Sequence, residues 1–256
     1  MATILSVDGL SKRYGGLTAV NGIDLAVEEG SITGLIGPNG AGKTTTFDMI
    51  AGAQKPSGGR ILFRGQDVTG WPTHRLFGLG IVRSFQIPKE YARLTVLENL
   101  MIVPPDQPGE SVWYTWFLPS AVREREAAVM ARAEETLDFL GLSRLRDERA
   151  GNCSGGQKKL LELGRAMMTD ARLVLLDEPG AGVNPTLMNS IAEMIERLNR
   201  ERGLSFFVIE HDMDLIARLC NPVIVLAEGR VLTRGPMATV REDARVIDAY
   251  FGGAVA

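Results

Sequence analysis

The residues whose types and spacing most clearly suggest chemistry are the nine in GPNGAGKTT, which begin at Gly37. Gly42, Lys43 and Thr44 complete the pattern G-x-x-x-x-G-K-[ST], which binds nucleotide phosphates. The glycines let successive backbone N–H groups curl around an anion, because a Cβ would forbid some of those dihedrals. Lys43 can reach the β- and γ-phosphates, and the Thr44 hydroxyl can ligate Mg²⁺. The predicted phosphate site comprises Gly37, Pro38, Asn39, Gly40, Ala41, Gly42, Lys43, Thr44 and Thr45.

Two acids follow an apolar run in LVLLDEP, and they supply the second half of the chemistry. The run predicts a buried strand, and Asp177 lies at its carboxyl end, where open α/β sheets bind ligands. Asp177 can hold Mg²⁺, and Glu178 can act as the general base for an attacking water. Alone, two acids after a strand more often lie in a solvated loop or cap a helix. When a phosphate loop is also present, the two acids are better interpreted as part of a catalytic site.

The elements that must position these residues can be read from periodicity. Segments 3–10, 17–27, 31–37 and 59–68 read as strands separated by glycine turns. Residues from about 88 to 168 are helical in pattern, and strands alternate with helices after them. Strand, glycine-rich loop, helix and further strand–helix pairs predict an α/β layered core interrupted by a helical lobe. The short motif GLG at 78–80 lacks a third glycine and predicts only a turn.

Composition limits the classes of protein that this chain can represent. It has 256 residues, 45% of them hydrophobic, and a net charge of −3 without a basic stripe, which argues against a nucleic-acid partner. Two cysteines and two histidines in no ligand spacing argue against a zinc site and favour a reducing, cytosolic compartment. The sequence predicts neither a signal peptide nor a membrane-spanning segment.

The motif CSGGQ, residues 153–157, makes a family resemblance specific. A phosphate loop combined with an SGGQ signature resembles the ATP-binding-cassette (ABC) ATPases, and the similarity extends over nearly all of the chain. The resemblance places Tyr14 against adenine, Gln86 in the Q-loop and His211 as the switch histidine. The signature residues are Ser154, Gly155, Gly156 and Gln157.

The resemblance also implies a fold, two cofactors and the roles of individual residues. The expected fold is α/β: a P-loop NTPase core (RecA-like) with an antiparallel β subdomain, residues 1–87 and 169–256, and an inserted α-helical subdomain, residues 88–168. The cofactors implied are ATP and Mg²⁺. The catalytic residues implied are Lys43, Gln86, Glu178 and His211. The metal ligands implied are Thr44, Gln86 and Asp177.

The family further implies partners and a place in the cell. Two cassettes would meet head to tail, so that the signature of each chain contacts the ATP bound at the phosphate loop of the other. The closing and opening of this pair would move transmembrane permease subunits. The second cassette could be the same or a paralogous chain, and a solute-binding protein would act indirectly. The expected location is the cytoplasmic face of the inner membrane. No nucleic acid is expected.

Several segments indicate which group of ABC ATPases this chain resembles. GLGIVRSFQ, VIEHDMDLI and the tail VREDARVIDAYFGG are similar to the ATPases of bacterial branched-chain amino acid importers. Alternatives within the superfamily are urea, amide or aromatic-acid uptake, lipopolysaccharide export, and soluble ABC proteins of translation or DNA repair. An alternative of another class is an ATP-sensing module that does not hydrolyse, although a sensor would not need Lys43, Gln86, Asp177, Glu178 and His211 together.

Three features depart from the common pattern or leave two interpretations open. The signature begins with Cys153, which predicts a small buried apolar position. Asn184 replaces the usual D-loop aspartate, and it is either only a helix N-cap or also a functional residue. The insert at 104–126 places Trp113 and Trp116 beside Tyr114 and Phe117. Its aromatics either complete the core of the helical lobe or form a platform for the permease.

Overall fold

The computed structural model describes residues 2–84, 90–105, 107, 109 and 112–251, with side chains at all but a few of these positions. The chain divides into two compact units. The first, called the nucleotide unit here, comprises Met1–Gln86 and Arg172–Ala256. The second, called the helical unit, comprises Ile87–Ala171.

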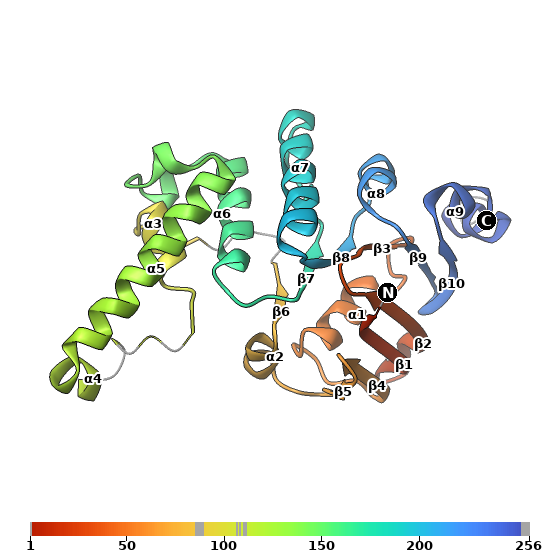
Figure 1. Ribbon diagram of the computed structural model, residues 1–256. Coiled ribbons are helices and arrows are strands. Elements are labelled where there is room, and N and C mark those ends of the chain that lie inside the picture. The colour runs from red at the N-terminus through yellow and green to blue at the C-terminus, as the bar shows by residue number, and fades with distance from the viewer. Residues whose placement is uncertain (1, 85–89, 106, 108, 110–111, 252–256) are drawn as a thin grey trace. The chain divides into compact units, whose positions relative to one another are not determined.

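A six-stranded sheet organises the nucleotide unit (Figure 1). Its strand order is β10-β9-β3-β8-β7-β6. The pairs β9/β3, β3/β8, β8/β7 and β7/β6 are parallel, whereas β10 returns antiparallel to β9. Strands β3, β7 and β8 are buried at every residue, as their continuous apolar runs require. The bounds are β3 (Ile32–Ile36), β6 (Ile81–Arg83), β7 (Leu173–Asp177), β8 (Ser205–Ile209), β9 (Val223–Ala227) and β10 (Arg230–Gly235).

A second, four-stranded sheet in the same unit is antiparallel, with the order β2-β1-β4-β5. Alternation of buried and exposed residues along β1 leaves one of its faces for the core. Several register shifts interrupt the pairing of β1 with β2, so this sheet is irregular near Tyr14. The bounds are β1 (Thr3–Tyr14), β2 (Leu17–Glu28), β4 (Gly58–Phe63) and β5 (Gln66–Asp67).

Six helices complete the described part of the nucleotide unit. Helices α7 and α8 lie on one face of the six-stranded sheet, and α1 lies on the other, beside the antiparallel sheet (Figure 1). In α7 the residues Ile191, Ile195 and Leu198 are buried, which matches the apolar stripe of its sequence. The bounds are α1 (Lys43–Ile50), α2 (Thr73–Leu79), α7 (Pro185–Arg202), α8 (Met213–Leu219), α9 (Met237–Glu242) and α10 (Ala244–Phe251).

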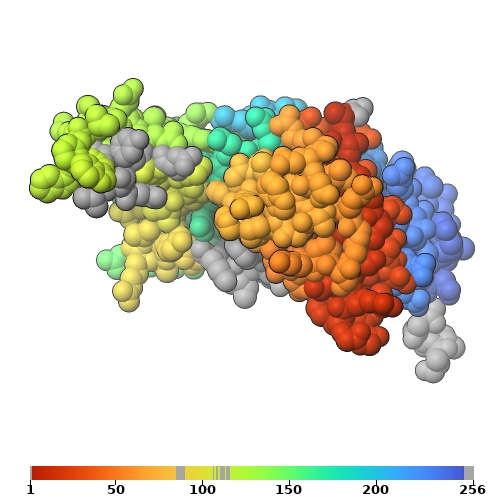
Figure 2. Space-filling view, turned by 90° about the horizontal axis from the view of Figure 1, so that it is seen from below, coloured from red at the N-terminus to blue at the C-terminus, as the bar shows by residue number. Residues whose placement is uncertain are grey.

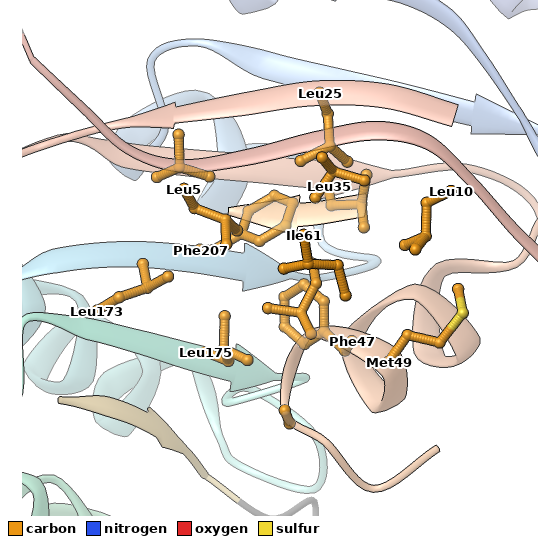
Figure 3. Close-up of a cluster of buried hydrophobic side chains, with 14 of the residues drawn as sticks. Leu5, Leu10, Leu25, Leu35, Phe47, Met49, Ile61, Leu173, Leu175 and Phe207 are labelled. Carbon is orange, nitrogen blue, oxygen red and sulfur yellow. The ribbon is translucent and has the colours of Figure 1, made fainter. Parts of the chain in front are cut away.

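The main core of this unit joins α1 to both sheets (Figure 3). Phe47 of α1 packs against Phe207 of β8, with ring centroids 4.9 Å apart. Leu5 and Ile61 reach the same cluster from the antiparallel sheet. Because α1 follows the phosphate loop directly, this packing fixes where the loop can place its backbone.

The helical unit is built around the contacts of three helices (Figure 1). A Cβ at Gly164 of α6 would meet Leu140 of α5 at 2.5 Å and Leu100 of α3 at 3.1 Å, so this glycine permits their close approach. Helix α4 packs on α5, and Figure 2 shows its segment at one end of the unit. The bounds are α3 (Val96–Met101), α4 (Val112–Phe117), α5 (Pro119–Leu140), α6 (Gly155–Met167) and the 3₁₀ turns Ser143–Leu145 and Ala150–Asn152.

One local prediction needs correction. Residues 78–80 are not simply a turn, because Gly78 and Leu79 end α2 and Gly80 is its left-handed C-cap. The three-residue strand β6 that follows is too short for periodicity to reveal. A hairpin turn at Glu228 and Gly229 joins β9 to β10. Among the residues described, no helix is long and apolar enough to cross a membrane.

Candidate nucleotide-binding site

The phosphate loop runs from the end of β3 into α1, and its glycines are required by close backbone contacts. A Cβ at Gly37 would lie 2.1 Å from the carbonyl oxygen of Leu226 on β9. Gly42 has a φ of 98°, and its Cβ would lie 2.6 Å from the carbonyl oxygen of Ala19. Gly42 is also the N-cap of α1 and offers no side-chain cap. The start of α1 therefore keeps backbone N–H groups for an anion, next to the positive end of the helix dipole.

Lys43 lies folded into the loop that precedes it. Its Nζ donates to the carbonyl oxygens of Gly37 at 2.7 Å and Pro38 at 3.0 Å, and the residue is 6% exposed. Burial lowers the pKa of the Lys43 ammonium, while the carboxylates of Glu178 and Asp177 oppose that shift. A phosphate in the loop would compete with the carbonyls for these donors, because an ammonium has only three.

Asp177 and Thr44 meet the requirements of a magnesium site. Asp177 is 2% exposed at the end of β7, and its Oδ1 is a buried oxygen without a hydrogen-bond partner in the part of the chain that the structure describes. Its Oδ2 accepts from Arg83 Nη2 at 2.7 Å. Thr44 is exposed in the first turn of α1. Mg²⁺ is usually held by one or two carboxylates together with substrate phosphates, so an orphaned carboxylate oxygen beside a phosphate loop fits the ion.

Glu178 and His211 form a pair at the ends of β7 and β8. His211 Nε2 lies 2.9 Å from Glu178 Oε1. Glu178 has a φ of 51°, a left-handed conformation that is strained for a glutamate. Its backbone N–H donates to the Ile209 carbonyl at 2.9 Å, which helps to hold this turn. Both side chains are part-exposed, at 27% for Glu178 and 45% for His211, so water can reach the carboxylate.

Tyr14 lies at the end of β1 with 43% of its surface exposed. The Lys12 ammonium lies 5.1 Å from the centroid of its ring. The Tyr14 hydroxyl donates to the Gln54 side chain, and Gln54 in turn donates to Asp48 of α1 at 3.0 Å. An exposed ring tied to the helix that follows the phosphate loop is suitably placed to stack on a nucleotide base.

The signature residues belong to the helical unit and begin α6. Ser154 is the N-cap, and its hydroxyl accepts from the Gln157 N–H at 3.3 Å. The Gln157 side chain in turn accepts a hydrogen bond from the Ser154 N–H at 2.8 Å. This reciprocal capping box satisfies two backbone donors, the N–H groups of Ser154 and Gln157, with side chains of the helix itself. Lys158, one residue later, pairs with Glu90 at 2.8 Å.

The remaining predictions have mixed outcomes. Gln86 lies outside the described residues. Cys153 is half-buried rather than fully buried, and burial is the main cause that raises the pKa of its thiol. Asn184 is confirmed as an N-cap, because its Oδ1 accepts from the Leu187 N–H at 2.9 Å. A further role for Asn184 stays a prediction.

The structure also shows functional neighbours that the sequence did not single out. Glu210 is 4% exposed, and its carboxylate accepts from the backbone of Gly180 at 2.6 Å and of His211 at 2.8 Å. It therefore fixes the turns that carry Glu178 and His211. The sequence signal that could have indicated Glu210 was an acidic residue directly before His211, the proposed switch histidine. Arg83 gave no such signal, because the strand that it ends is too short for periodicity to reveal.

The aromatic side chains of the insert are exposed where they are described. Trp113, Trp116 and Phe117 are 72%, 79% and 65% exposed, and the rings of Trp113 and Phe117 stack with centroids 4.6 Å apart. The prediction that these aromatics complete the core of the helical lobe is therefore wrong for all three. The side chain of Tyr114 lies outside the description.

Comparison with known proteins places these features in a family. A family model described as ABC transporter matches residues 20–181. The chain belongs to the ABC transporter family. With that family come the P-loop ATPase fold and ATP hydrolysis coupled to transport.

Curated relatives and solved structures cover almost the whole cassette. A probable branched-chain amino acid transport ATP-binding protein, LivG, of Archaeoglobus fulgidus is 41% identical over 249 residues, which are 97% of this chain and 95% of that protein. The high-affinity branched-chain amino acid transport protein BraF of Pseudomonas aeruginosa is 37% identical, and 98% of each chain is covered.

Among solved structures, the ADP conformation of an ATP-binding cassette of an ABC transporter matches with a TM-score of 0.84 and 35% identity. That match covers 98% of this chain and 100% of the other. A nucleotide-free ATP-binding cassette matches with a TM-score of 0.82 and 35% identity, covering 96% of this chain and 98% of the other.

Proposed function

We propose that this cassette is the ATP-hydrolysing subunit of an ABC importer for branched-chain or related amino acids. The observation that carries the proposal is the convergence of Lys43, Asp177, Glu178 and His211 around one phosphate loop in the nucleotide unit. The names of the relatives LivG and BraF favour amino acids as the class of solute.

In this proposal the chain's residues divide the work along the nucleotide. Tyr14 stacks on the base, the loop N–H groups bind the phosphates, and Lys43 moves its ammonium from the loop carbonyls to the phosphate oxygens. Thr44 and Asp177 hold Mg²⁺, which when bound neutralises charge on the β- and γ-phosphates. Gln86, at the Q-loop position, is proposed as a further ligand of that site.

Hydrolysis itself needs a base and a group that senses the γ-phosphate. Glu178 takes a proton from the attacking water, and its strained backbone keeps the carboxylate at the end of the sheet. His211, positioned by Glu210, contacts the γ-phosphate. The present contact with His211 involves only Oε1 of Glu178, and the carboxylate is exposed enough for a water molecule to reach it.

Assembly follows the head-to-tail arrangement of the family. Ser154, Gly155, Gly156 and Gln157 act on the ATP of a second cassette, and the pair docks on transmembrane permease subunits at the cytoplasmic face of the membrane. A solute-binding protein delivers the amino acid to the permease. Closure on ATP and opening after hydrolysis drive transport, because each state binds nucleotide differently.

A reconstituted transporter tests this proposal. The cassette would be purified with the permease and binding protein encoded beside it, and ATP hydrolysis measured with leucine, urea or a lipid substrate. We expect stimulation by leucine, and in Glu178→Gln a loss of hydrolysis of about a hundredfold or more with ATP binding retained. Stimulation by urea or lipid alone would reassign the solute, and near-normal turnover in Glu178→Gln would exclude this residue as the base.

A further inference from the structure

A chain of polar contacts inside the nucleotide unit links the loop helix α1 to the proposed metal ligand. Arg83, the last residue of β6, donates through Nη1 to Asp48 Oδ1 on α1 and through Nη2 to Asp177 Oδ2 on β7 at 2.7 Å. The other oxygen of Asp48 accepts from Gln54, which itself holds the Tyr14 hydroxyl. Asp48 is therefore fixed on both of its oxygens.

These contacts are shielded from bulk water. The Arg83 side chain is 17% exposed, Asp48 is 21% exposed and Asp177 is 1% exposed. Shielded charge pairs keep their strength, and leaving one partner alone in such a place is costly. A guanidinium suits this position, because its planar fork can hold two carboxylates in a fixed relation, whereas an ammonium is a single flexible point charge.

The position of Asp48 gives the arrangement a consequence for the metal. Asp48 lies four residues after Thr44 on α1, so the two residues share one face of the helix, one turn apart. Arg83 thus connects the helix that carries Thr44 to the strand that carries Asp177. With Oδ2 of Asp177 held by Arg83, Oδ1 is left for a metal ion, and among the described residues that oxygen has no hydrogen-bond partner.

We propose that Arg83 is a positioning residue for magnesium: it clamps Asp177 to α1 and thereby sets the spacing of the two metal ligands that the chain provides. The inference rests on the proposed function, because it concerns the magnesium–nucleotide complex in that site. Arg83 does not itself touch nucleotide or metal. Without Arg83, the Asp177 carboxylate is released and is no longer held at a fixed spacing from Thr44.

The quantity to measure is the metal enhancement, defined as the ratio of the dissociation constants of the non-hydrolysable analogue AMP-PNP in EDTA and in Mg²⁺. Calorimetry on the purified cassette gives both constants without relying on turnover. We expect Arg83→Lys and Arg83→Gln to reduce the enhancement by about tenfold or more, the usual range for losing a partner that orients a metal ligand. Affinity in EDTA should stay near that of the unaltered chain, since the phosphate loop is intact.

Two further variants make the experiment specific. Asp48→Asn should lower the enhancement in the same direction but less, because Arg83 still holds Asp177. Arg60→Gln is the matched control, since Arg60 lies exposed on β4 of the same unit and its nearest acid, Asp8, is 3.9 Å away. Arg60→Gln should leave the enhancement unchanged.

Two results would overturn the inference. Full enhancement in Arg83→Lys would mean that charge alone is needed, and an enhancement above that of the unaltered chain would mean that Arg83 competes with the metal. Should neither Arg83 variant fold, Asp48→Asn decides, and an unchanged enhancement there rejects the clamp. If the unaltered chain binds no AMP-PNP in either condition, the proposed function fails instead.

Discussion

The starts of two helices, α1 and α6, can be compared, because the proposed function assigns both to ATP phosphates. Helix α1 begins at Gly42, whose left-handed backbone offers no side-chain cap. Helix α6 begins at Ser154 with a complete capping box. The start of α1 has no side-chain cap, whereas at the start of α6 two backbone donors, the N–H groups of Ser154 and Gln157, are already paired with side chains of the helix itself.

The difference suggests how the two sites are used. A helix start without a side-chain cap gains most from a bound phosphate, because the phosphate satisfies donors that otherwise rely on water. A capped start can stand alone as a stable element, so the chain can present it at a surface. This fits the proposal that α1 binds ATP within its own chain while α6 waits for the ATP of a second chain.

The largest effect is expected at the open start. Lys43→Ala removes the ammonium that lies in the loop, and with it the point charge for the β- and γ-phosphates. ATP binding should weaken by about a hundredfold, a loss comparable to that of a buried charged hydrogen bond, and hydrolysis should vanish. Calorimetry measures the binding. Unchanged affinity would show that the open start is not the nucleotide site.

Mixing two inactive chains tests whether the capped start acts on a partner. A chain with Lys43→Ala and a chain with Ser154→Asp should each be inactive alone. If the sites are shared, mixed dimers contain one intact site, and random pairing of independent sites restores about a quarter of the normal activity. The assay includes the permease so that the cassettes pair. If confirmed mixed dimers show no activity, α6 does not act on the ATP of a second chain, since each chain would then act alone.

Two substitutions at Ser154 separate capping from phosphate binding. Asp caps helices as well as Ser does, so Ser154→Asp should keep the melting temperature, yet its charge should repel a partner's γ-phosphate and abolish turnover. Ser154→Ala should cost about 1 kcal/mol of stability through the lost cap. Scanning calorimetry and ATPase assays report the two effects. Normal turnover in both variants would mean that Ser154 serves only as a cap.

The smallest effect on folding is expected at the exposed aromatics of the insert. Trp113→Ser with Trp116→Ser should leave the melting temperature and ATP binding nearly unchanged, because both rings are mostly in water. If the insert docks on the permease, co-purification of the two should fall.

The third tryptophan provides the control for that pair. Trp71 is partly buried and packs against the core of the nucleotide unit, so Trp71→Ser should lower the melting temperature clearly. A large loss of stability in the Trp113 and Trp116 variant, with assembly intact, would instead make the insert part of the fold.

Local sequence was enough to predict the open start of α1. The phosphate loop, Asp177 and Glu178 lie next to the elements that hold them, so spacing and apolar pattern locate each one. The Asn184 cap and the hairpin at Glu228 were predictable for the same reason, since each depends on neighbouring residues only.

The Arg83 clamp could not be predicted in this way. Arg83 is 35 residues from Asp48 and 94 residues from Asp177 along the chain, so their contacts exist only after the sheet has formed. Strand β6 is three residues long and carries no periodic signal. The left-handed backbone of Glu178 was equally hidden, because no sequence rule places a glutamate there.

That left-handed backbone has a consequence for how this protein can change. A side chain with a Cβ held at a φ of 51° costs about 1 to 3 kcal/mol of folding free energy, and glycine would remove most of that cost. Replacement of Glu178 by glycine would therefore give a more robust fold without the proposed base. Under the proposed function, mutation toward stability and selection for transport pull in opposite directions at this position.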